Sequence, residues 1–597
     1  MISAATANGH VCIGLTALAR QLGQPVDAIR AALLVSGVAA RVNDDAPAPR
    51  LPLVIDVDDR LYLARYYAFE RGISNALNER AQTRREDALT DDPHGLRAVV
   101  TRYFGEATDE GIDWQRVAAA VALTGRLTIV SGGPGTGKTT TVVGMLACLL
   151  DIRPGLRIAL AAPTGKAAQR MQEALASRAD RLAQDIAVRL PTTSYTLHRL
   201  LGSTPDGGFR HHRRNPLPYD VIVVDEASMI DVALASRLVD AVAPRARLIL
   251  LGDKDQLAAV EAGAVFAELS AHPCYAGKRA EHIAQALGCT ADVLRNALSP
   301  YAHNGLPHSE RDARPAALAN CVVWLQTNYR FGLDSPIGQL SSAIRDGLPS
   351  DALDVLDASD DDAPAFFIDD TGPALSNASR EHIAQGFAGY ANLLVGILRH
   401  RAPDAGPLFD ALNAFRVLCA VRAGPYGADA LNEWISGELR RLARLPLAPG
   451  ARWFPGRPVI VTRNDYALGL FNGDIGIALP GDDGALRVVF EQGAGSRRTV
   501  LPAMLPSHDT AFALTVHKSQ GSEFEQAALV LPPTFNRALS RELIYTAVTR
   551  ARARIAIIGT RAVLAQAVGT PTRRDTGLSA RLRYAAARTQ RETAPSS

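Results

Sequence analysis

The chain has 597 residues, of which 47% are hydrophobic and 21% are charged. A typical domain has ~100–150 residues, so the length predicts at least three or four folding units rather than one small module. The composition is close to that of soluble globular proteins, which excludes disorder, collagen and a simple coiled coil as descriptions of the whole chain. The net charge of +3 neither supports nor excludes a nucleic-acid partner.

The cysteines and the apolar segments indicate where the protein resides. The six cysteines are scattered and form no CxxC pair, so neither a disulfide framework nor a zinc site is expected, and a reducing compartment is the default. No apolar run reaches the ~18–20 residues that a membrane span needs, and the N-terminus lacks the pattern of a signal peptide. We therefore expect a cytoplasmic protein.

Residues 1–105 contain apolar periodicity but no recognisable chemistry. Residues 53–57 are typical of a short strand, and Asp58 and Asp59 of a turn. This pattern predicts a mostly helical N-terminal domain. A stripe of large side chains at helical spacing follows the turn, and it indicates either protein core or a face that docks a partner protein. The stripe consists of Tyr62, Tyr66, Phe69, Ile73 and Leu77.

Residues 106–345 are expected to form an α/β domain. Buried strands alternate there with helical stretches, which is typical of a parallel sheet covered on both faces. Residues 271–320 show no clear period and are expected to be a surface insertion. The predicted strands are residues 127–131, 157–161, 221–225 and 248–251.

Residues 346–570 are expected to form a second α/β domain, ending with a strand over residues 554–559. Inside it, residues 453–505 predict a small inserted antiparallel, β-barrel-like subdomain, because short strands alternate there with glycine and aspartate turns. Its predicted strands are residues 458–462, 475–479, 486–490 and 499–501. Residues 571–597 are rich in arginine and are interpreted as a basic C-terminal tail.

Residues 132–139 read GGPGTGKT and stand between a predicted strand and a predicted helix, as a phosphate-binding loop requires. Backbone N–H groups and the helix N-terminus cradle phosphates in such a loop, while Lys138 reaches the β/γ-phosphates and the Thr139 hydroxyl binds Mg²⁺. The residues expected to bind the nucleotide here are Gly132, Gly133, Pro134, Gly135, Thr136, Gly137, Lys138, Thr139 and Thr140.

The strand over residues 221–225 supplies the second half of this site. It delivers Asp225 to the metal at its C-terminal end and places Glu226 to polarise the attacking water. The carboxylate pair favours hydrolysis of ATP or GTP over transfer by a nucleotide kinase. Gln115 lies one short helix before the loop strand, where its amide is suited to reading adenine, although an exposed polar role fits the sequence equally well.

Further segments favour a motor over a generic nucleotide hydrolase. Residues 162–170 and 251–257 follow two of the predicted strands, and Gln256 in the latter is placed to sense the γ-phosphate. Arg330 and Arg550 lie in later segments. An arginine that faces the γ-phosphate across a cleft stabilises the transition state and couples hydrolysis to closure, whereas the alternative for either arginine alone is a surface ion pair.

Seven segments in this order resemble the motifs of superfamily 1 DNA helicases of the 5′-to-3′ type, and more closely those of the RecD family, the alpha subunits of exodeoxyribonuclease V (RecBCD). They are GGPGTGKTT, APTGKAAQRM, VIVVDEAS, LGDKDQL, TNYRF, AFALTVHKSQGSEF and YTAVTRAR. Residues 415–427 and 461–474, the latter including Tyr466, are also similar to RecD. The resemblance implies two RecA-like P-loop motor domains with ATP and Mg²⁺ between them and single-stranded DNA across their top.

The resemblance also implies residue roles and partners. Gln115 would read adenine, Asp225 and Glu226 would bind metal and activate water, and Gln256, Arg330 and Arg550 would face the γ-phosphate. The implied activity is that of an ATP-dependent 5′-to-3′ helicase and translocase, joined to RecB-like and RecC-like subunits on DNA ends in double-strand break repair and recombination. The implied DNA contacts are Pro163, Thr164, Thr196, His198, Thr515, His517 and Lys518.

Two alternatives are a free-standing 5′-to-3′ helicase and an interaction subunit whose ATP site acts only as a switch. The complete hydrolytic set, which includes Glu226, Gln256 and both arginines, argues against a pure switch. We find no acidic cluster typical of a nuclease outside the nucleotide site, so we expect any DNA cutting to belong to a partner chain. For the same reason residues 1–105 are interpreted as a partner-docking domain.

Overall fold

The computed structural model describes residues 1–42, 50–82, 92–106, 111–204, 206–297, 317–330, 332, 334–358, 363–399, 404–445, 452–465, 467–491 and 497–593. Tyr466 and much of the expected insertion lie outside the described residues. None of the described helices is both long enough and apolar enough to cross a bilayer.

The first motor domain is built on a six-stranded parallel sheet in the order β10-β5-β9-β8-β6-β7. Successive side chains of its strands point to opposite faces, so Leu248 and Leu250 enter one core while Ile249 and Leu251 enter the other. The strands are β5 (Leu127–Gly132), β6 (Ile158–Ala162), β7 (Ser194–Thr196), β8 (Val221–Val224), β9 (Arg247–Gly252) and β10 (Val322–Leu325).

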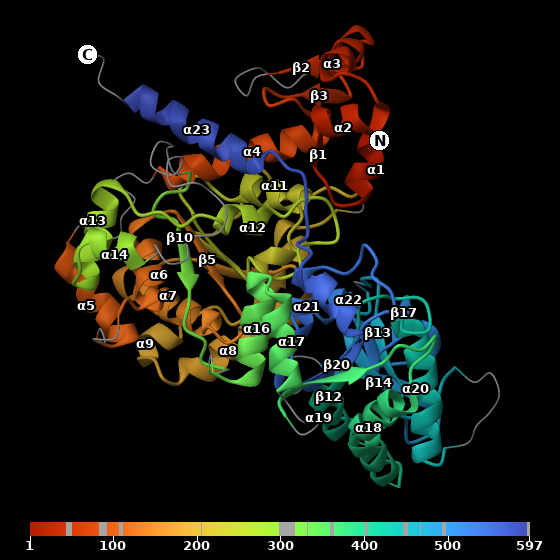
Figure 1. Ribbon diagram of the computed structural model, residues 1–597. Coiled ribbons are helices and arrows are strands. Elements are labelled where there is room, and N and C mark those ends of the chain that lie inside the picture. The colour runs from red at the N-terminus through yellow and green to blue at the C-terminus, as the bar shows by residue number, and fades with distance from the viewer. Residues whose placement is uncertain are drawn as a thin grey trace.

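Helices cover both faces of this sheet (Figure 1). On one side lie α5 (Pro93–Phe104), α6 (Trp114–Thr124), α7 (Lys138–Ile152), α8 (Gly165–Ala179) and α9 (Gln184–Ala187). On the other side lie α10 (Leu197–Leu201), α11 (Val232–Ala241) and α12 (Val265–Ser270), with the short helix η2 (Ala227–Met229).

The described part of residues 271–320 differs from the expected surface insertion. It forms α13 (Gly277–Leu287) and α14 (Ala291–Ala297), and α13 packs against α5 and α6. Ile283 and Leu294 are fully buried in the core of the first motor domain. The helical period was missed because charged and histidine side chains separate these apolar positions.

The second motor domain has a five-stranded parallel sheet in the order β11-β20-β19-β12-β18. Two separate cores lie on its faces, as expected for a RecA-like domain. The strands are β11 (Ala365–Asp369), β12 (Phe415–Cys419), β18 (Ala513–Thr515), β19 (Phe524–Val530) and β20 (Ala551–Gly559). The helices are α16 (Pro336–Asp346), α17 (Pro349–Asp357), α18 (Asn377–Ile397), α19 (Gly406–Ala414), α20 (Ala428–Leu442), α21 (Arg541–Val548) and α22 (Arg561–Val568), with η6 (Val516–Ser519).

The inserted β subdomain is a five-stranded antiparallel sheet in the order β16-β15-β14-β13-β17, so β16 and β17 are its edges. Val459, Val488 and Phe490 are buried in a small core of its own. Its elements are β13 (Pro458–Val461), β14 (Ile475–Pro480), β15 (Leu486–Glu491), β16 (Arg497–Val500), η5 (Pro502–Met504) and β17 (His508–Thr510).

The N-terminal region contains a four-stranded sheet, in the order β1-β4-β3-β2, besides its helices. These strands have only three or four residues each, which explains why periodicity did not predict most of them. The elements are α1 (Ile2–Ala7), β1 (Cys12–Gly14), α2 (Leu15–Leu22), α3 (Val26–Val35), β2 (Ala39–Arg41), β3 (Leu53–Ile55), β4 (Arg60–Leu63) and α4 (Ala64–Ala81).

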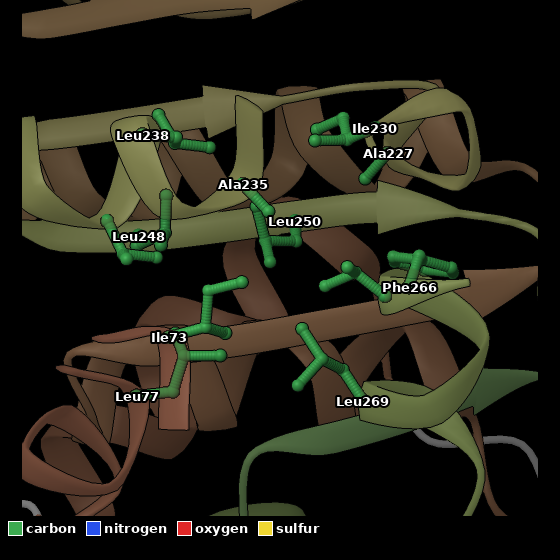
Figure 2. Close-up of a pocket in the computed structure, with 12 residues that line it drawn as sticks. Ile73, Leu77, Ala227, Ile230, Ala235, Leu238, Leu248, Leu250, Phe266 and Leu269 are labelled. Atoms are coloured by element: carbon green, nitrogen blue, oxygen red, sulfur yellow. The ribbon is translucent and has the colours of Figure 1, made fainter. Parts of the chain in front are cut away.

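The stripe of large side chains in this region packs inside the protein. Ile73 and Leu77 of α4 are fully buried and line a small apolar cavity with Leu248 and Leu250 of β9 and Leu269 of α12 (Figure 2). Tyr62 is fully buried as well. The core interpretation therefore applies to Tyr62, Ile73 and Leu77, which offer no surface to a partner.

The C-terminal segment is not a detached basic tail. It forms α23 (Leu578–Thr593), which lies along α4 (Figure 1). Arg581 is 2% exposed and forms ion pairs with Asp56 at 3.2 Å and Glu70 at 3.5 Å. The backbone N–H of Gly577 donates to both oxygens of Glu70, at 3.0 and 3.1 Å. Arg581 is thus bonded to two buried carboxyl groups, so this part of a basic segment is internal.

Candidate nucleotide and DNA site

The loop between β5 and α7 requires glycine at two positions. Gly135 and Gly137 have φ angles of 84° and 80°, in the left-handed region that L side chains rarely adopt. A Cβ at Gly135 would lie 2.4 Å from the Cβ of Arg330, and one at Gly137 would lie 2.4 Å from Gln115 Nε2. The loop is therefore closed over by Arg330 on one side and by Gln115 on the other.

Lys138 begins α7 and lies folded over the same loop. Its Nζ donates to the carbonyl oxygens of Gly132 at 2.6 Å and Gly133 at 3.1 Å. The first N–H groups of a helix have no acceptor within it, and in α7 these belong to Lys138, Thr139 and Thr140. The ammonium and the free N–H groups form a site suited to an anion such as a triphosphate.

Asp225 and Glu226 follow β8. Asp225 accepts the Glu226 N–H at 2.8 Å, and Glu226 has a φ of 52°, a strained value for a residue with a side chain. Burial raises the pKa of Asp225 to about 6, Glu226 adds to the rise, and Lys138 opposes it. A buried carboxyl group held in this way is stabilised in its charged form by a cation, so Asp225 fits a cation such as Mg²⁺.

Gln256 follows β9 and lies beside a third acidic group. Its Nε2 donates to Asp253 at 3.0 Å, while its Oε1 is buried with no hydrogen-bond partner in the described part of the chain. Burial raises the pKa of Asp253 to about 6, and Asp255 adds to the rise. The phenol of Tyr545, from α21 of the second motor domain, hydrogen-bonds Asp253. Gln256 thus lies where the two motor domains meet.

Arg330 belongs to a segment that lies on the phosphate loop. The Tyr329 N–H donates to the Gly135 carbonyl at 2.8 Å, and Asn328 Nδ2 donates to the Pro134 carbonyl at 3.0 Å. The Arg330 guanidinium donates to Glu523 of the second motor domain at 2.7 Å. Arg330 therefore contacts both sides of the cleft.

Arg550 follows α21 of the second motor domain, the helix whose Tyr545 lies against the same loop. Its guanidinium is buried and donates to the carbonyls of Thr546 and Ser522, both at 3.2 Å, while Nη2 has no hydrogen-bond partner among the described residues. Burial lowers the pKa of Arg550, and among the charged groups that oppose this shift Glu226 of the first motor domain acts most strongly. Tyr545 and Thr546 both belong to α21. A Cβ at Gly133 would lie 2.8 Å from the Tyr545 hydroxyl, so α21 lies against the phosphate loop.

The first group of expected DNA contacts lies at one edge of the first sheet. Pro163 and Thr164 follow β6, and Thr196 ends the neighbouring parallel strand β7. Thr164 and Thr196 use their hydroxyls to cap α8 and α10. His198 is exposed on α10, with its ring 5.9 Å from that of Phe209.

The second group of expected DNA contacts, Thr515, His517 and Lys518, lies at the end of β18 and in η6. In this structure its side chains contact other protein groups. Thr515 caps η6, and Lys518 forms an ion pair with Asp509 of β17 at 2.6 Å. Burial lowers the pKa of His517, and Arg574 of the C-terminal segment adds to this effect. A Cβ at Gly521 would lie 3.7 Å from the Thr164 hydroxyl, so the segment that follows η6 meets Thr164 at the domain boundary.

Several residues at the site received no individual role from the sequence. Asn328 and Tyr329 hold the Arg330 segment on the loop, Asp253 and Tyr545 join the two domains, and Glu523 binds Arg330. All five lie inside the motif-like segments quoted above. Their position inside those segments was the sequence feature that could have identified them. Their contacts could not be predicted, because these depend on the assembled fold.

Two doubly wound parallel sheets, the first carrying a phosphate loop and the second carrying the helix α21 that lies against this loop, define the motor of a superfamily 1 helicase. Residues 115–262 match the family model described as AAA domain, and residues 510–558 match the UvrD-like helicase C-terminal domain.

The chain is 37% identical to the RecBCD enzyme subunit RecD of Mycolicibacterium smegmatis, over 97% of this chain and 91% of the relative. It is 33% identical to the same subunit of Haemophilus influenzae, over 81% and 74% of the two chains. The ATP-dependent RecD2 DNA helicase of Deinococcus radiodurans is 30% identical, over 86% of this chain and 57% of that protein. The chain belongs to the RecD family, and it is an ATP-dependent DNA helicase.

Proposed function

We propose that the protein translocates 5′-to-3′ along single-stranded DNA and is driven by hydrolysis of ATP with Mg²⁺. The observation that carries the proposal is the buried Arg550 guanidinium, which keeps one nitrogen without a partner among the described residues. Glu226 of the first motor domain is the charged group that most favours its protonated form. An arginine held in this way is ready to meet charge that develops on a γ-phosphate, and its contact requires the two motor domains to be close together.

In this proposal each site residue has a separate role. Lys138 and the first N–H groups of α7 hold the phosphates, Thr139 and Asp225 hold Mg²⁺, and Gln115 lies beside the loop where it would read adenine. Bound Mg²⁺ would supply charge that offsets the phosphate oxygens. Glu226 would take a proton from the attacking water, with Gln256, Arg330 and Arg550 stabilising the transition state.

Hydroxyls and backbone groups at the ends of β6, β7 and β18 are suited to gripping DNA phosphates without reading bases. The 5′-to-3′ direction rests on the family resemblance alone. Unwinding assays on duplexes with a 5′ or a 3′ single-stranded tail test it, with the 5′-tailed substrate expected to be used. Efficient unwinding of only the 3′-tailed substrate would overturn the direction.

The relatives that are named RecBCD enzyme subunit RecD support a place for this chain beside RecB-like and RecC-like chains. We further propose that such a complex acts on DNA ends in the cytoplasm, with nuclease activity in a partner. We assign attachment to the N-terminal region. Its buried stripe is used internally, but Leu34, Val35 and Val38 at the end of α3 are exposed, Val35 to 88%. Exposed apolar side chains this close together are suited to a protein interface.

Co-purification with RecB-like and RecC-like chains tests the attachment. Val35→Asp combined with Val38→Asp should abolish capture of the partners while leaving ATPase activity stimulated by single-stranded DNA. The matched control is Val188→Asp, which charges another exposed valine, on the first motor domain. Undiminished capture by the double variant would contradict this surface. Unwinding by a wild-type chain that captures no partner would favour the free-standing helicase.

A further inference from the structure

One carboxylate, that of Glu523, binds three arginines drawn from both motor domains. Glu523 immediately precedes β19 in the second domain, and its Oε1 accepts from Arg330 at 2.7 Å. Its Oε2 forms an ion pair with Arg170 at 3.1 Å and accepts a hydrogen bond from Arg552 at 3.0 Å. Arg170 and Arg330 belong to the first domain and Arg552 to the second, so Glu523 bridges the cleft.

The charge on Glu523 is firmly held. Its side chain is only 14% exposed, and burial alone would raise its pKa. Arg170 and Arg330 outweigh that effect, and the pKa falls to about 2. The carboxylate is therefore ionised at any physiological pH, and it balances guanidinium groups that would otherwise repel one another.

Two of the three arginines connect Glu523 to segments with different expected roles. Arg170 lies on α8, whose N-terminal end carries the expected DNA contacts Pro163 and Thr164, and it also donates to the Gly521 carbonyl at 2.9 Å. Arg330 lies on the phosphate loop. Glu523 thus stands between the DNA edge of the first sheet and the nucleotide site.

Glu523 is also tied to the second arginine of the nucleotide site. The residues on either side of it both bond Arg550: the Ser522 carbonyl accepts from its guanidinium at 3.2 Å, and the Phe524 N–H donates to its carbonyl at 2.9 Å. A displacement of Glu523 therefore moves the segment that holds Arg550.

We propose that Glu523 is a positioning residue that couples DNA binding to ATP turnover, because it holds Arg330 and Arg550 in place relative to helix α8. This inference rests on the proposed roles of those two arginines. DNA that moves the N-terminal end of α8 moves Arg170, and Arg170 passes the movement to Glu523. Arg330 can then exchange the carboxylate for the γ-phosphate, since both are anions that a guanidinium binds well.

The decisive variant is Glu523→Gln, which keeps the shape and one acceptor oxygen but removes the charge. Steady-state ATPase of the full chain is measured with and without an unstructured oligonucleotide, over a range of ATP concentrations. We expect kcat with DNA to fall roughly 10- to 100-fold, as for a misplaced catalytic group. The KM for ATP should change less than about threefold, because ground-state binding is retained. The ratio of the rates with and without DNA should fall toward one.

The matched control is Glu525→Gln, two residues further on, where the side chain is exposed. It should behave as the wild type. A second variant, Arg170→Gln, should also lower the DNA stimulation, and the double variant should be no worse than the more impaired single variant, because the two residues act through one contact.

Three results would overturn the inference. In the first, Glu523→Gln keeps the wild-type stimulation by DNA, with or without a lower melting temperature, which would make Glu523 merely structural. In the second, the losses of Glu523→Gln and Arg170→Gln multiply in the double variant. In the third, KM rises with kcat unchanged. Failure of the proposed function is distinguishable, since the wild-type chain itself would then show no ATPase stimulated by DNA.

Discussion

Leu257 of the first motor domain donates its backbone N–H to Thr546 Oγ1 of the second, at 2.8 Å. The Leu257 carbonyl accepts from Gln520 Nε2, also of the second domain, at 2.7 Å. Both polar groups of one residue are therefore held by the opposite domain. Because Gln256 precedes Leu257, its backbone cannot move away from the second motor domain without straining these bonds.

Replacing Thr546 with valine tests this link. Valine has nearly the same shape but leaves the buried Leu257 N–H without an acceptor, which costs about 1–3 kcal/mol. We expect faster amide hydrogen exchange at Leu257 and lower ATP turnover at unchanged fold, as judged by circular dichroism. The control is Thr371→Val, which changes an exposed threonine just after β11. Unchanged exchange at Leu257 would show that the bond does not hold the domains together.

The Lys138→Gln variant tests the phosphate site. A neutral amide cannot offset charge that develops on the phosphates, so ATP turnover should fall by about 10²-fold or more, the order expected for loss of a main electrostatic contact. Steady-state ATPase in the presence of single-stranded DNA measures the effect, and a melting curve checks the fold. Near-normal turnover in a folded variant would defeat the assignment.

Changing Arg550 or Arg330 to alanine should separate coupling from binding. Residues that act mainly on the transition state lower kcat strongly and change ATP affinity little. Titration with a fluorescent nucleotide beside steady-state ATPase checks both quantities, and Arg573→Ala, at an exposed arginine of the C-terminal segment, serves as the control. Weaker nucleotide binding with unchanged turnover would instead show that these arginines contact the nucleotide in the ground state.

Local motifs predicted which segments the fold brings together at the candidate nucleotide site. The phosphate loop, Asp225 and Glu226 each lie in one short segment next to a buried strand, and parallel strands bring such ends to one edge. The inserted antiparallel strands were predictable for a similar reason, since each alternates or ends at a glycine turn.

Contacts between distant segments were not predictable. Glu523 meets Arg170 and Arg330, and Arg581 meets Glu70, across hundreds of residues. Periodicity describes which side of an element is apolar, but it does not say which element covers it. The sequence therefore indicated a basic tail where the fold contains a buried ion pair.

That ion pair makes the junction of α4 and α23 sensitive to pH. Burial raises the pKa of Glu70 from 4.5 to about 7, with Glu268 adding to the rise, while Arg581, the Gly577 N–H and Tyr62 oppose it. The folded junction keeps a proton that the opened one releases between pH 4.5 and 7. The stability of the junction is therefore fully present below pH 4.5 and is lost as the pH rises through about 7.

Comparison of the wild type with Glu70→Gln isolates this effect from the other titrating groups, because glutamine keeps an acceptor for Gly577 but has no proton to lose. We expect the difference in opening free energy between wild type and variant, from hydrogen exchange in α23, to decrease by at most about 3 kcal/mol between pH 4.5 and 7 and then to level off. The comparison at each pH cancels the intrinsic rate of exchange. A difference that stays flat, or that grows in favour of the wild type as the pH rises, would mean that Glu70 is already ionised in the folded protein and that Arg581 outweighs burial.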